Sequence, residues 1–553
     1  MKASRDEERT IEIVSCNEQQ DELRSIEEAN RGHRLEDDSS TFDKGELHRG
    51  LHQRHVQMIA IAGCIGTGLF LGSGNSLRTA GPLGALIGYA LVCSVVYCTL
   101  CSVAEMASFA PISGSFPYYA TRWVDPALGF ASGWIYYSTY ALAAPAEISA
   151  SVILLTYWDS NTNHIALYTA IVWIVVCMFS LFGVRYFGES EVVFASIKIS
   201  LIIGLLLCGL VIDLGGGPRG DRIGFRFWKN PGALNRAGLV DNINTDRFLA
   251  IMSTIVQAAF SLNGMELVAI SSSETESPRR NIKKAVTRVF YRLMAFYILG
   301  ILMIGMLVAH NDPALLNPSQ TAAASPFVIA IKRAGIEVLP SVINAAIFTS
   351  ALSTSNTAVY LSSRILYGLS LHRQAPRILT RCTKNGLPIA AVGTTLALSL
   401  LSFLNVRDGS QQVFTWLSGL VALGSLFGWI TMNVTYLFFH RGMRVQNYDL
   451  KQNVYNHPLQ PYLAVYGLLW SLIFVLINGY AVFFRWNASD FVISYINIPI
   501  FALLYFGYKI IKRTKIIRPE EMDFVTGIPT LEETEIPQRP TRNVFHTFIR
   551  WLV

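Results

Sequence analysis

The stretch that decides the fold is AGCIGTGLFLG, residues 62–72. It lies inside an apolar segment, yet four of its eleven residues are glycine. Each glycine costs a continuous helix about 1 kcal/mol relative to alanine. A second stretch, AFSLNGME at residues 259–266, interrupts another apolar segment with polar side chains and a glycine. We therefore predict two helices that break partway along their length.

The composition around these breaks is that of a membrane protein. Of the 553 residues, 52% are hydrophobic and only 15% are charged, against roughly a quarter charged in soluble domains. Apolar stretches long enough to cross a bilayer, about 20 residues each, recur along the chain. The net charge of +7 arises largely from loops beside these stretches, where basic residues set orientation. We expect membrane lipids as partners, and no nucleic acid.

We predict an all-α integral membrane protein with twelve transmembrane helices. They fall at approximately 58–77, 83–108, 127–157, 165–185, 190–213, 248–272, 286–309, 340–368, 387–405, 412–438, 462–484 and 490–511. Segments 277–292 and 364–384 carry six and five Lys/Arg respectively and no acidic residue, which places them in the cytoplasm. Residues 1–50 then form a disordered N-terminal tail, 51–512 the membrane domain and 513–553 a C-terminal tail, with both termini cytoplasmic.

The two breaks fall in spans 1 and 6, which are equivalent positions if five spans form one repeat. Such paired interruptions mark substrate sites in transporters. Free N–H groups at a helix start attract an anion, and free C=O groups at a helix end attract a cation. A zwitterionic α-amino acid carries both charges, and Gly66 and Gly68 would let its carboxylate approach the backbone. The alternative is that these glycines only permit close helix packing.

The chain also resembles the fungal (yeast-type) amino-acid permeases of the amino acid–polyamine–organocation superfamily. The resemblance covers roughly residues 48–520 and rests on LHQRHVQMIA at 51–60, GTGLF at 66–70, EMA at 105–107, SGSF at 113–116, APAE at 144–147, GMELV at 264–268, Glu274, PRR at 278–280, NA at 344–345 and SR at 363–364. It implies a LeuT-type fold, with two inverted five-helix repeats plus two extra helices. It also implies proton-coupled amino-acid uptake at the plasma membrane.

The same resemblance assigns roles around the breaks. Gly66, Thr67 and Gly68 look like a carboxylate-binding turn. The carbonyls of Ile65, Phe260 and Ser261 look like an ammonium site, and Phe260 resembles an aromatic gate. The substrate side chain would face the positions that follow, so the predicted substrate-binding set is completed by Leu262, Asn263 and Gly264.

Charged residues inside the predicted spans are costly and are therefore functional candidates. Lys198, inside span 5, stands by resemblance where sodium-coupled relatives hold a cation, and is our first choice for proton coupling. A fixed structural cation is the alternative. Glu147 and Glu266 are further proton-coupling candidates, whereas Glu105 could equally form a structural ion pair with a loop arginine.

Three function classes compete. The paired breaks and Lys198 favour a symporter of zwitterionic L-amino acids. A nutrient sensor (transceptor) of the same fold would signal only, and a membrane enzyme would need a catalytic constellation that no span carries. We expect no metal and no cofactor. Lys2 and Lys44 in the N-terminal tail could accept ubiquitin through ligase adaptors, although a plain solvated tail is an equal alternative.

Overall fold

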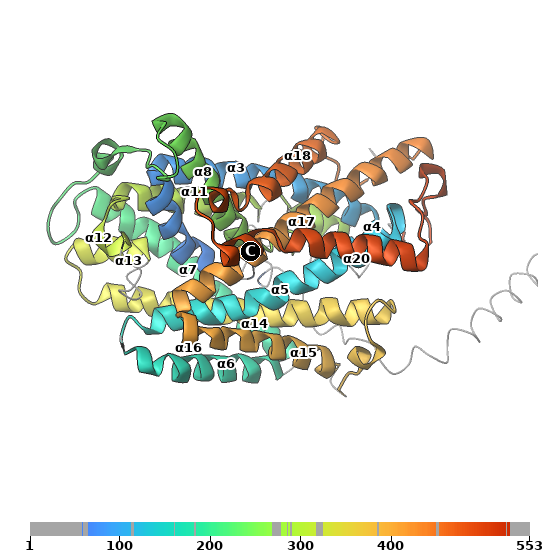
Figure 1. Cartoon of the computed structure of the whole chain (residues 1–553), viewed down its shortest axis with the longest axis horizontal. Coiled ribbons are helices and arrows are strands. Elements are labelled where there is room, and N and C mark those ends of the chain that lie inside the picture. The colour runs from blue at the N-terminus through green and yellow to red at the C-terminus, as the bar shows by residue number, and fades with distance from the viewer. Residues whose placement is uncertain are drawn as a thin grey trace, which may run out of the picture.

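The computed structural model of the chain describes Met58, Gly63 and residues 65–111, 115–159, 161–181, 184–267, 278–284, 286–287, 290–316, 325–383, 386–448, 453–526 and 528–530. The predictions for Lys2, Lys44 and most of both tails lie outside these residues. Within the described part every regular element is helical (Figure 1). The long helices are α3 (Ser73–Phe109), α5 (Pro126–Leu155), α6 (Ile165–Leu181), α7 (Val184–Asp213), α8 (Ile243–Ser261), α11 (Phe290–Leu307), α14 (Leu339–Leu371), α15 (Ile389–Ser399), α17 (Ser410–Val445), α18 (Tyr462–Ile477) and α20 (Asn497–Lys512).

Eight helices among the described residues are long and apolar enough to cross a membrane. A ninth is added if the bent pair α19 (Ala488–Tyr495) and α20 counts as one span. The first of the eight, Gly68–Phe109, joins parts of two predicted spans. The two parts meet at Gly81, whose φ of +77° breaks the helical path just before Pro82. The boundary predicted between spans 1 and 2 is therefore a sharp bend in the chain.

Two further helices, α8 and α14, occupy the positions of predicted spans 6 and 8 but are too polar to count among the eight. The reason is visible in α14, where buried Ser and Asn side chains such as Asn344 and Ser353 face other helices. Asn344, for instance, donates from its side chain to the carbonyl of Leu154 on α5, 2.9 Å away. Polar side chains are tolerated at this depth when neighbouring helices satisfy them.

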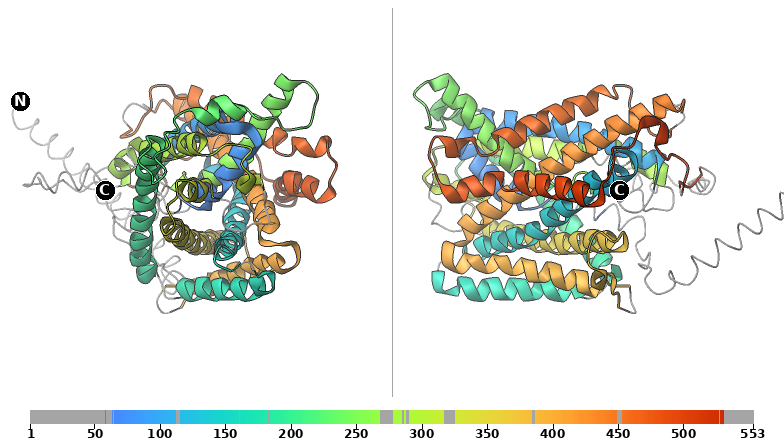
Figure 2. Two further views of the ribbon diagram at one scale, coloured as in Figure 1. Left: turned by 90° about the vertical axis from the view of Figure 1, so that its left-hand side faces the viewer. Right: turned by 45° about the vertical axis from the view of Figure 1, so that its right-hand side comes forward.

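The helices divide into a central group and a peripheral group (Figure 2). α5 packs along both α14 and α17, and its most apolar stretch is 83% buried within the protein. The equivalent stretch of α6 is only 17% buried. Exposed side chains follow one face of α6 at intervals of three and four residues: Leu167, Ile171, Ile174, Met178 and Leu181. Such an apolar stripe on an outer helix is suited to contact with lipid.

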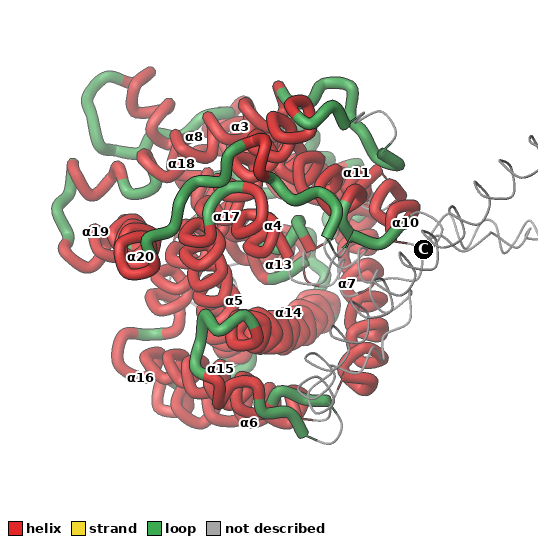
Figure 3. The backbone as a smooth tube through the Cα atoms, turned by 90° about the vertical axis from the view of Figure 1, so that its right-hand side faces the viewer, coloured by secondary structure: helices red, strands yellow, loops and turns green. Residues whose placement is uncertain are grey.

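A C-terminal strap, residues 513–526 with 528–530, crosses one end of the bundle from α20 towards α10 (Pro278–Lys284) (Figure 3). Arg122, on α4 (Ser115–Trp123), donates to the carbonyls of Asp523 and Thr526 at 2.8 and 2.6 Å. Phe524 is buried and its ring packs edge-on against Phe109 and Phe439. The strap is thus bound to several helix ends at once.

The carboxylate of Asp523 is part of this attachment. Its burial opposes ionisation, but the backbone N–H groups of Thr526 and Val525 and the guanidinium of Arg122 outweigh that effect. Together they lower the pKa of Asp523 to about 2. The ion pair between Arg122 and Asp523 measures 3.1 Å and is formed at neutral pH.

Candidate functional site

The two predicted helix breaks lie against each other. The chain enters a helical path at Thr67 and runs through η1 (Gly68–Gly72) into α3, while α8 ends at Ser261 and is followed by turns to Glu266. A Cβ atom on Gly68 would lie 2.6 Å from the Cα of Ser261. Gly68 is therefore required for close backbone packing. Close helix packing is the alternative explanation that the sequence offers for these glycines, and at Gly68 it applies within the site itself.

A cavity opens between these breaks and the central helices. It encloses about 430 Å³ of space between protein atoms, counting its opening to solvent. Its walls come from four helical elements and from both breaks: Gly63, Gly66, Gly68, Tyr140, Ala143, Glu147, Phe260, Ser261, Asn263, Thr354, Thr357, Ala358 and Leu361. Its lining is mostly small or hydroxyl-bearing, with a single carboxylate and no basic side chain.

Five of the predicted substrate-binding residues line this cavity, namely Gly66, Gly68, Phe260, Ser261 and Asn263. Asn263 is held there by Ser425 on α17, whose hydroxyl lies 2.8 Å from the Asn263 side-chain oxygen. The Phe260 ring meets Phe414 edge-on with 5.7 Å between ring centroids.

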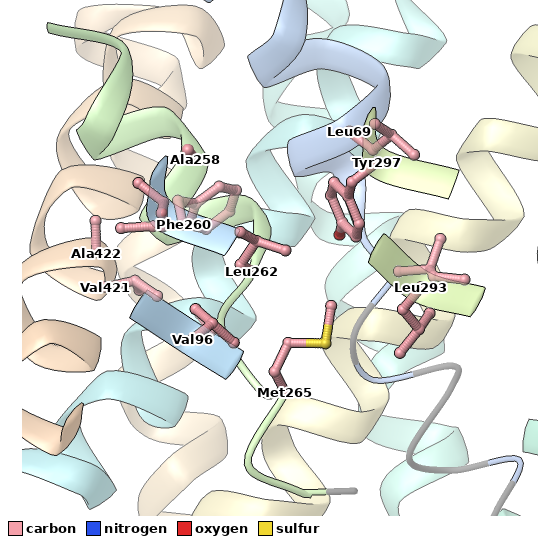
Figure 4. Close-up of a cluster of buried hydrophobic side chains, with 14 of the residues drawn as sticks. Leu69, Val96, Ala258, Phe260, Leu262, Met265, Leu293, Tyr297, Val421 and Ala422 are labelled. Atoms are coloured by element: carbon pink, nitrogen blue, oxygen red, sulfur yellow. The ribbon is translucent and has the colours of Figure 1, made fainter. Parts of the chain in front are cut away.

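The other four lie at the breaks without lining the cavity. Leu262 is fully buried and points into the hydrophobic cluster formed with Phe260, Val96 and Met265 (Figure 4). This differs from the predicted side-chain pocket, because the turn after Ser261 rotates alternate residues to opposite sides. Gly264 makes that turn with φ of +91°. Ile65 and Thr67 frame the first break and are both buried.

The backbone carbonyls expected to bind an ammonium group already have protein partners. Tyr297 on α11 donates its hydroxyl to the carbonyl of Ser261 at 2.5 Å. The carbonyl of Phe260 accepts the N–H of Asn263 at 3.2 Å. The carbonyl of Ile65 lies 3.4 Å from the hydroxyl of Thr354, which has a closer acceptor in Ser350 at 2.9 Å. Each carbonyl has a second lone pair, so a ligand ammonium can still be accepted.

Two of the three predicted proton-coupling residues, Lys198 and Glu147, lie beside the first break. Lys198 is fully buried, and its ammonium donates to the hydroxyl of Thr354 on α14 at 2.9 Å. It thus lies between α7, α14 and the break. Glu147 on α5 is buried, lines the cavity, and accepts the N–H of Thr67 at 3.4 Å. Glu266 is buried beyond the second break and accepts the Tyr140 hydroxyl at 3.1 Å, outside the cavity lining.

One buried carboxylate was missed in the sequence analysis. Glu191 on α7 is fully buried and lies within 3.2 and 3.0 Å of the Ser353 hydroxyl through its two oxygens. It precedes Lys198 by seven residues, which is two helical turns, so both face α14. That spacing was the available signal. In the sequence Glu191 falls at the edge of the predicted span, where a charged residue is ordinary.

Glu105 has a different role from the ion pair considered above. At the end of α3 its side chain accepts the Tyr436 hydroxyl at 2.5 Å and the backbone N–H of His457 at 2.7 Å. The partners in the structure are thus a phenol and a backbone amide. Glu105 fastens the segment between α17 and α18 to α3.

The chain is similar to known proteins along most of its length. The family model described as "Amino acid permease" matches residues 55–519, which is most of the chain. The chain belongs to the amino acid permease family. This permease is 41% identical over 516 residues to a proline-specific permease of Emericella nidulans, covering 91% of this chain and 93% of that protein.

Two relatives from Saccharomyces cerevisiae show how widely the family's specificity varies. The dicarboxylic amino acid permease is 36% identical, with 89% of this permease and 82% of the relative aligned. The general amino-acid permease GAP1 is 37% identical, with 87% and 80% aligned. The protein is therefore a multi-pass membrane transporter of amino acids and not an enzyme. Its relatives differ in substrate, so sequence identity alone does not tell which amino acid this permease transports.

Proposed function

We propose that this permease couples the uptake of zwitterionic L-amino acids to the entry of protons across the plasma membrane. The observation that carries the proposal is the cavity at the junction of the two helix breaks, with Lys198 and Glu147 buried beside it. We further propose twelve spans in a LeuT-type 5+5 arrangement, with both termini in the cytoplasm. In that arrangement α14 and α8 cross the membrane as polar, protein-covered spans.

The chemistry of the cavity supports a neutral zwitterion. The helix that starts at Thr67 directs N–H groups towards the cavity, which favours a substrate carboxylate. The end of α8 at Ser261 presents carbonyl groups, which favour an ammonium group. No Lys or Arg lines the cavity to bind a second substrate carboxylate. The side-chain end is bounded by Asn263, Thr357 and Leu361, which suits a small or medium neutral side chain.

Proton coupling is supported by the charges behind the cavity. One lysine, Lys198, faces the region of two buried carboxylates, Glu147 and Glu191, and full ionisation leaves one uncompensated negative charge. An uncompensated buried charge is costly, so this group favours taking up one proton. A membrane potential of ~100 mV supplies about 2.3 kcal/mol per proton. That corresponds to roughly fifty-fold accumulation at 1.36 kcal/mol per decade.

The test is a screen of radiolabelled L-amino acids in yeast cells that lack their own permeases. We expect accumulation of at least one neutral amino acid, greater at pH 5 than at pH 7 and abolished by a protonophore. Uptake that ignores both the pH and the protonophore would overturn proton coupling. Binding without uptake of any amino acid would instead favour the sensor reading.

A further inference from the structure

The carboxylate of Glu147 lies where a substrate carboxylate is expected. Its Oε1 accepts the N–H of Thr67 at 3.4 Å, at the start of the helix that continues through α3. A Cβ on Gly66 would lie 2.8 Å from the same oxygen, so the glycine is what lets the carboxylate reach the backbone. Glu147 comes from α5, a different element from the break it contacts.

Glu147 is also incompletely satisfied. Its side chain lines the cavity and is only 3% exposed. The second carboxylate oxygen, Oε2, has no hydrogen-bond partner among the described residues. A buried carboxylate with an open acceptor and one long hydrogen bond is weakly held. It is therefore able to leave Thr67 when its charge is neutralised.

A substrate carboxylate and an ionised Glu147 compete for the same N–H groups. Two carboxylates at one site repel each other, and such pairs do not both ionise at low cost. We propose that Glu147 is a built-in substitute for the substrate carboxylate, which must take up a proton and leave Thr67 before an amino acid binds. This inference rests on the proposed function and specifies the order of its steps, with the proton first and the substrate second.

The surrounding charges are consistent with this exchange. From α7, Lys198 faces Glu147 and donates to Thr354, which lies 3.2 Å from a Cβ on Gly66. Glu191 lies on the same face of α7. α14 lines the cavity with the hydroxyl groups of Thr354 and Thr357 and with apolar Ala358 and Leu361. Glu266 lies beyond Tyr140. When Glu147 takes up a proton and leaves Thr67, a substrate carboxylate can take its place, so the N–H of Thr67 again faces one carboxylate. The zwitterionic substrate is neutral overall, so the exchange adds only the positive charge of the proton, which offsets the negative charge that Lys198 leaves uncompensated on Glu147 and Glu191.

The test measures the dissociation constant of radiolabelled L-proline, with L-alanine and L-leucine as further probes, for the purified permease in lipid nanodiscs between pH 4.5 and 7.5. For the wild type we expect the dissociation constant to rise with pH, by up to about tenfold per unit where Glu147 ionises, because one proton is bound with the substrate. The Glu147→Gln variant should bind these amino acids tightly at every pH, with less than about twofold change in the dissociation constant. In cells this variant should not accumulate substrate against a gradient.

The Glu147→Asp variant distinguishes the effect of the contact with Thr67 from the effect of the carboxylate charge. The shorter side chain still ionises, but a carboxylate already 3.4 Å from Thr67 no longer reaches it. We therefore expect the pH dependence of binding to be weaker in this variant than in the wild type, because the competition for Thr67 is lost while repulsion of the substrate carboxylate persists at a longer distance. A wild-type slope in either Glu147→Gln or Glu147→Asp would overturn the inference.

Two controls keep the outcomes distinct. Glu105→Gln alters another buried carboxylate, remote from the cavity and bonded to Tyr436 and His457, and should keep the wild-type slope. Thermal unfolding of each variant establishes that it is folded. If the wild type accumulates amino acids with protons but binds them with no pH dependence, only this inference fails. If the wild type transports no amino acid, the proposed function fails.

Discussion

Replacing Gly68 by alanine tests the contact between the two helix breaks directly. The new Cβ would lie 2.6 Å from both the Cα and the Oγ of Ser261, and 2.9 Å from its Cβ. Because the obstacle is backbone, the chain must shift, and overpacking of this kind costs about 1–3 kcal/mol. We expect Gly68→Ala to lower the stability of the folded protein by that amount and to impair uptake by separating the cavity walls.

A matched control is available on α14. A Cβ added to Gly368 would meet nothing within 4 Å, so Gly368→Ala should stabilise the protein by about 0.5–1 kcal/mol through helix propensity alone. Thermal unfolding of both purified variants in detergent measures the difference, and substrate uptake gives an independent readout. Equal melting temperatures for Gly68→Ala and Gly368→Ala would refute the close approach of η1 to Ser261.

Four further predictions follow from the buried charges and from the strap. Lys198→Ala should abolish pH-driven uptake, and full accumulation by this variant would contradict its role in coupling. Ser353→Ala removes the hydroxyl that Glu191 accepts and should lower stability by about 1–3 kcal/mol in thermal unfolding, whereas no change would mean that Glu191 has another stabilising partner. Phe524→Ala should speed amide hydrogen exchange in residues 519–526 while the helices keep wild-type protection, since its ring anchors the strap. Because the pKa of Asp523 is lowered to about 2, its contribution is complete above about pH 4 and is lost as pH falls towards 2, so wild-type exchange in the strap should accelerate only in that window.

The buried charges show which residues of the site can be predicted from their positions along the chain and which cannot. Lys198 and Glu147 could be proposed from sequence because each interrupts an apolar run. In the sequence Glu191 could not be distinguished from a charged residue at an ordinary helix end. Its partner Ser353 lies on a helix more than 150 residues away. Glu105 could be recognised as buried, but its partners Tyr436 and His457 come from distant segments that sequence spacing does not bring together.

The sequence alone determined a helical membrane protein with two glycine-containing breaks, because apolar length and helix-breaking residues are local properties. It also placed the candidate charges along the chain. Only the tertiary structure decided that the breaks touch through Gly68 and Ser261, and that Leu262 faces the core while Asn263 faces the cavity. Only the tertiary structure placed the Glu147 carboxylate on the N–H of Thr67. These arrangements depend on how helices pack against one another, and the residues that set that packing lie far apart in sequence.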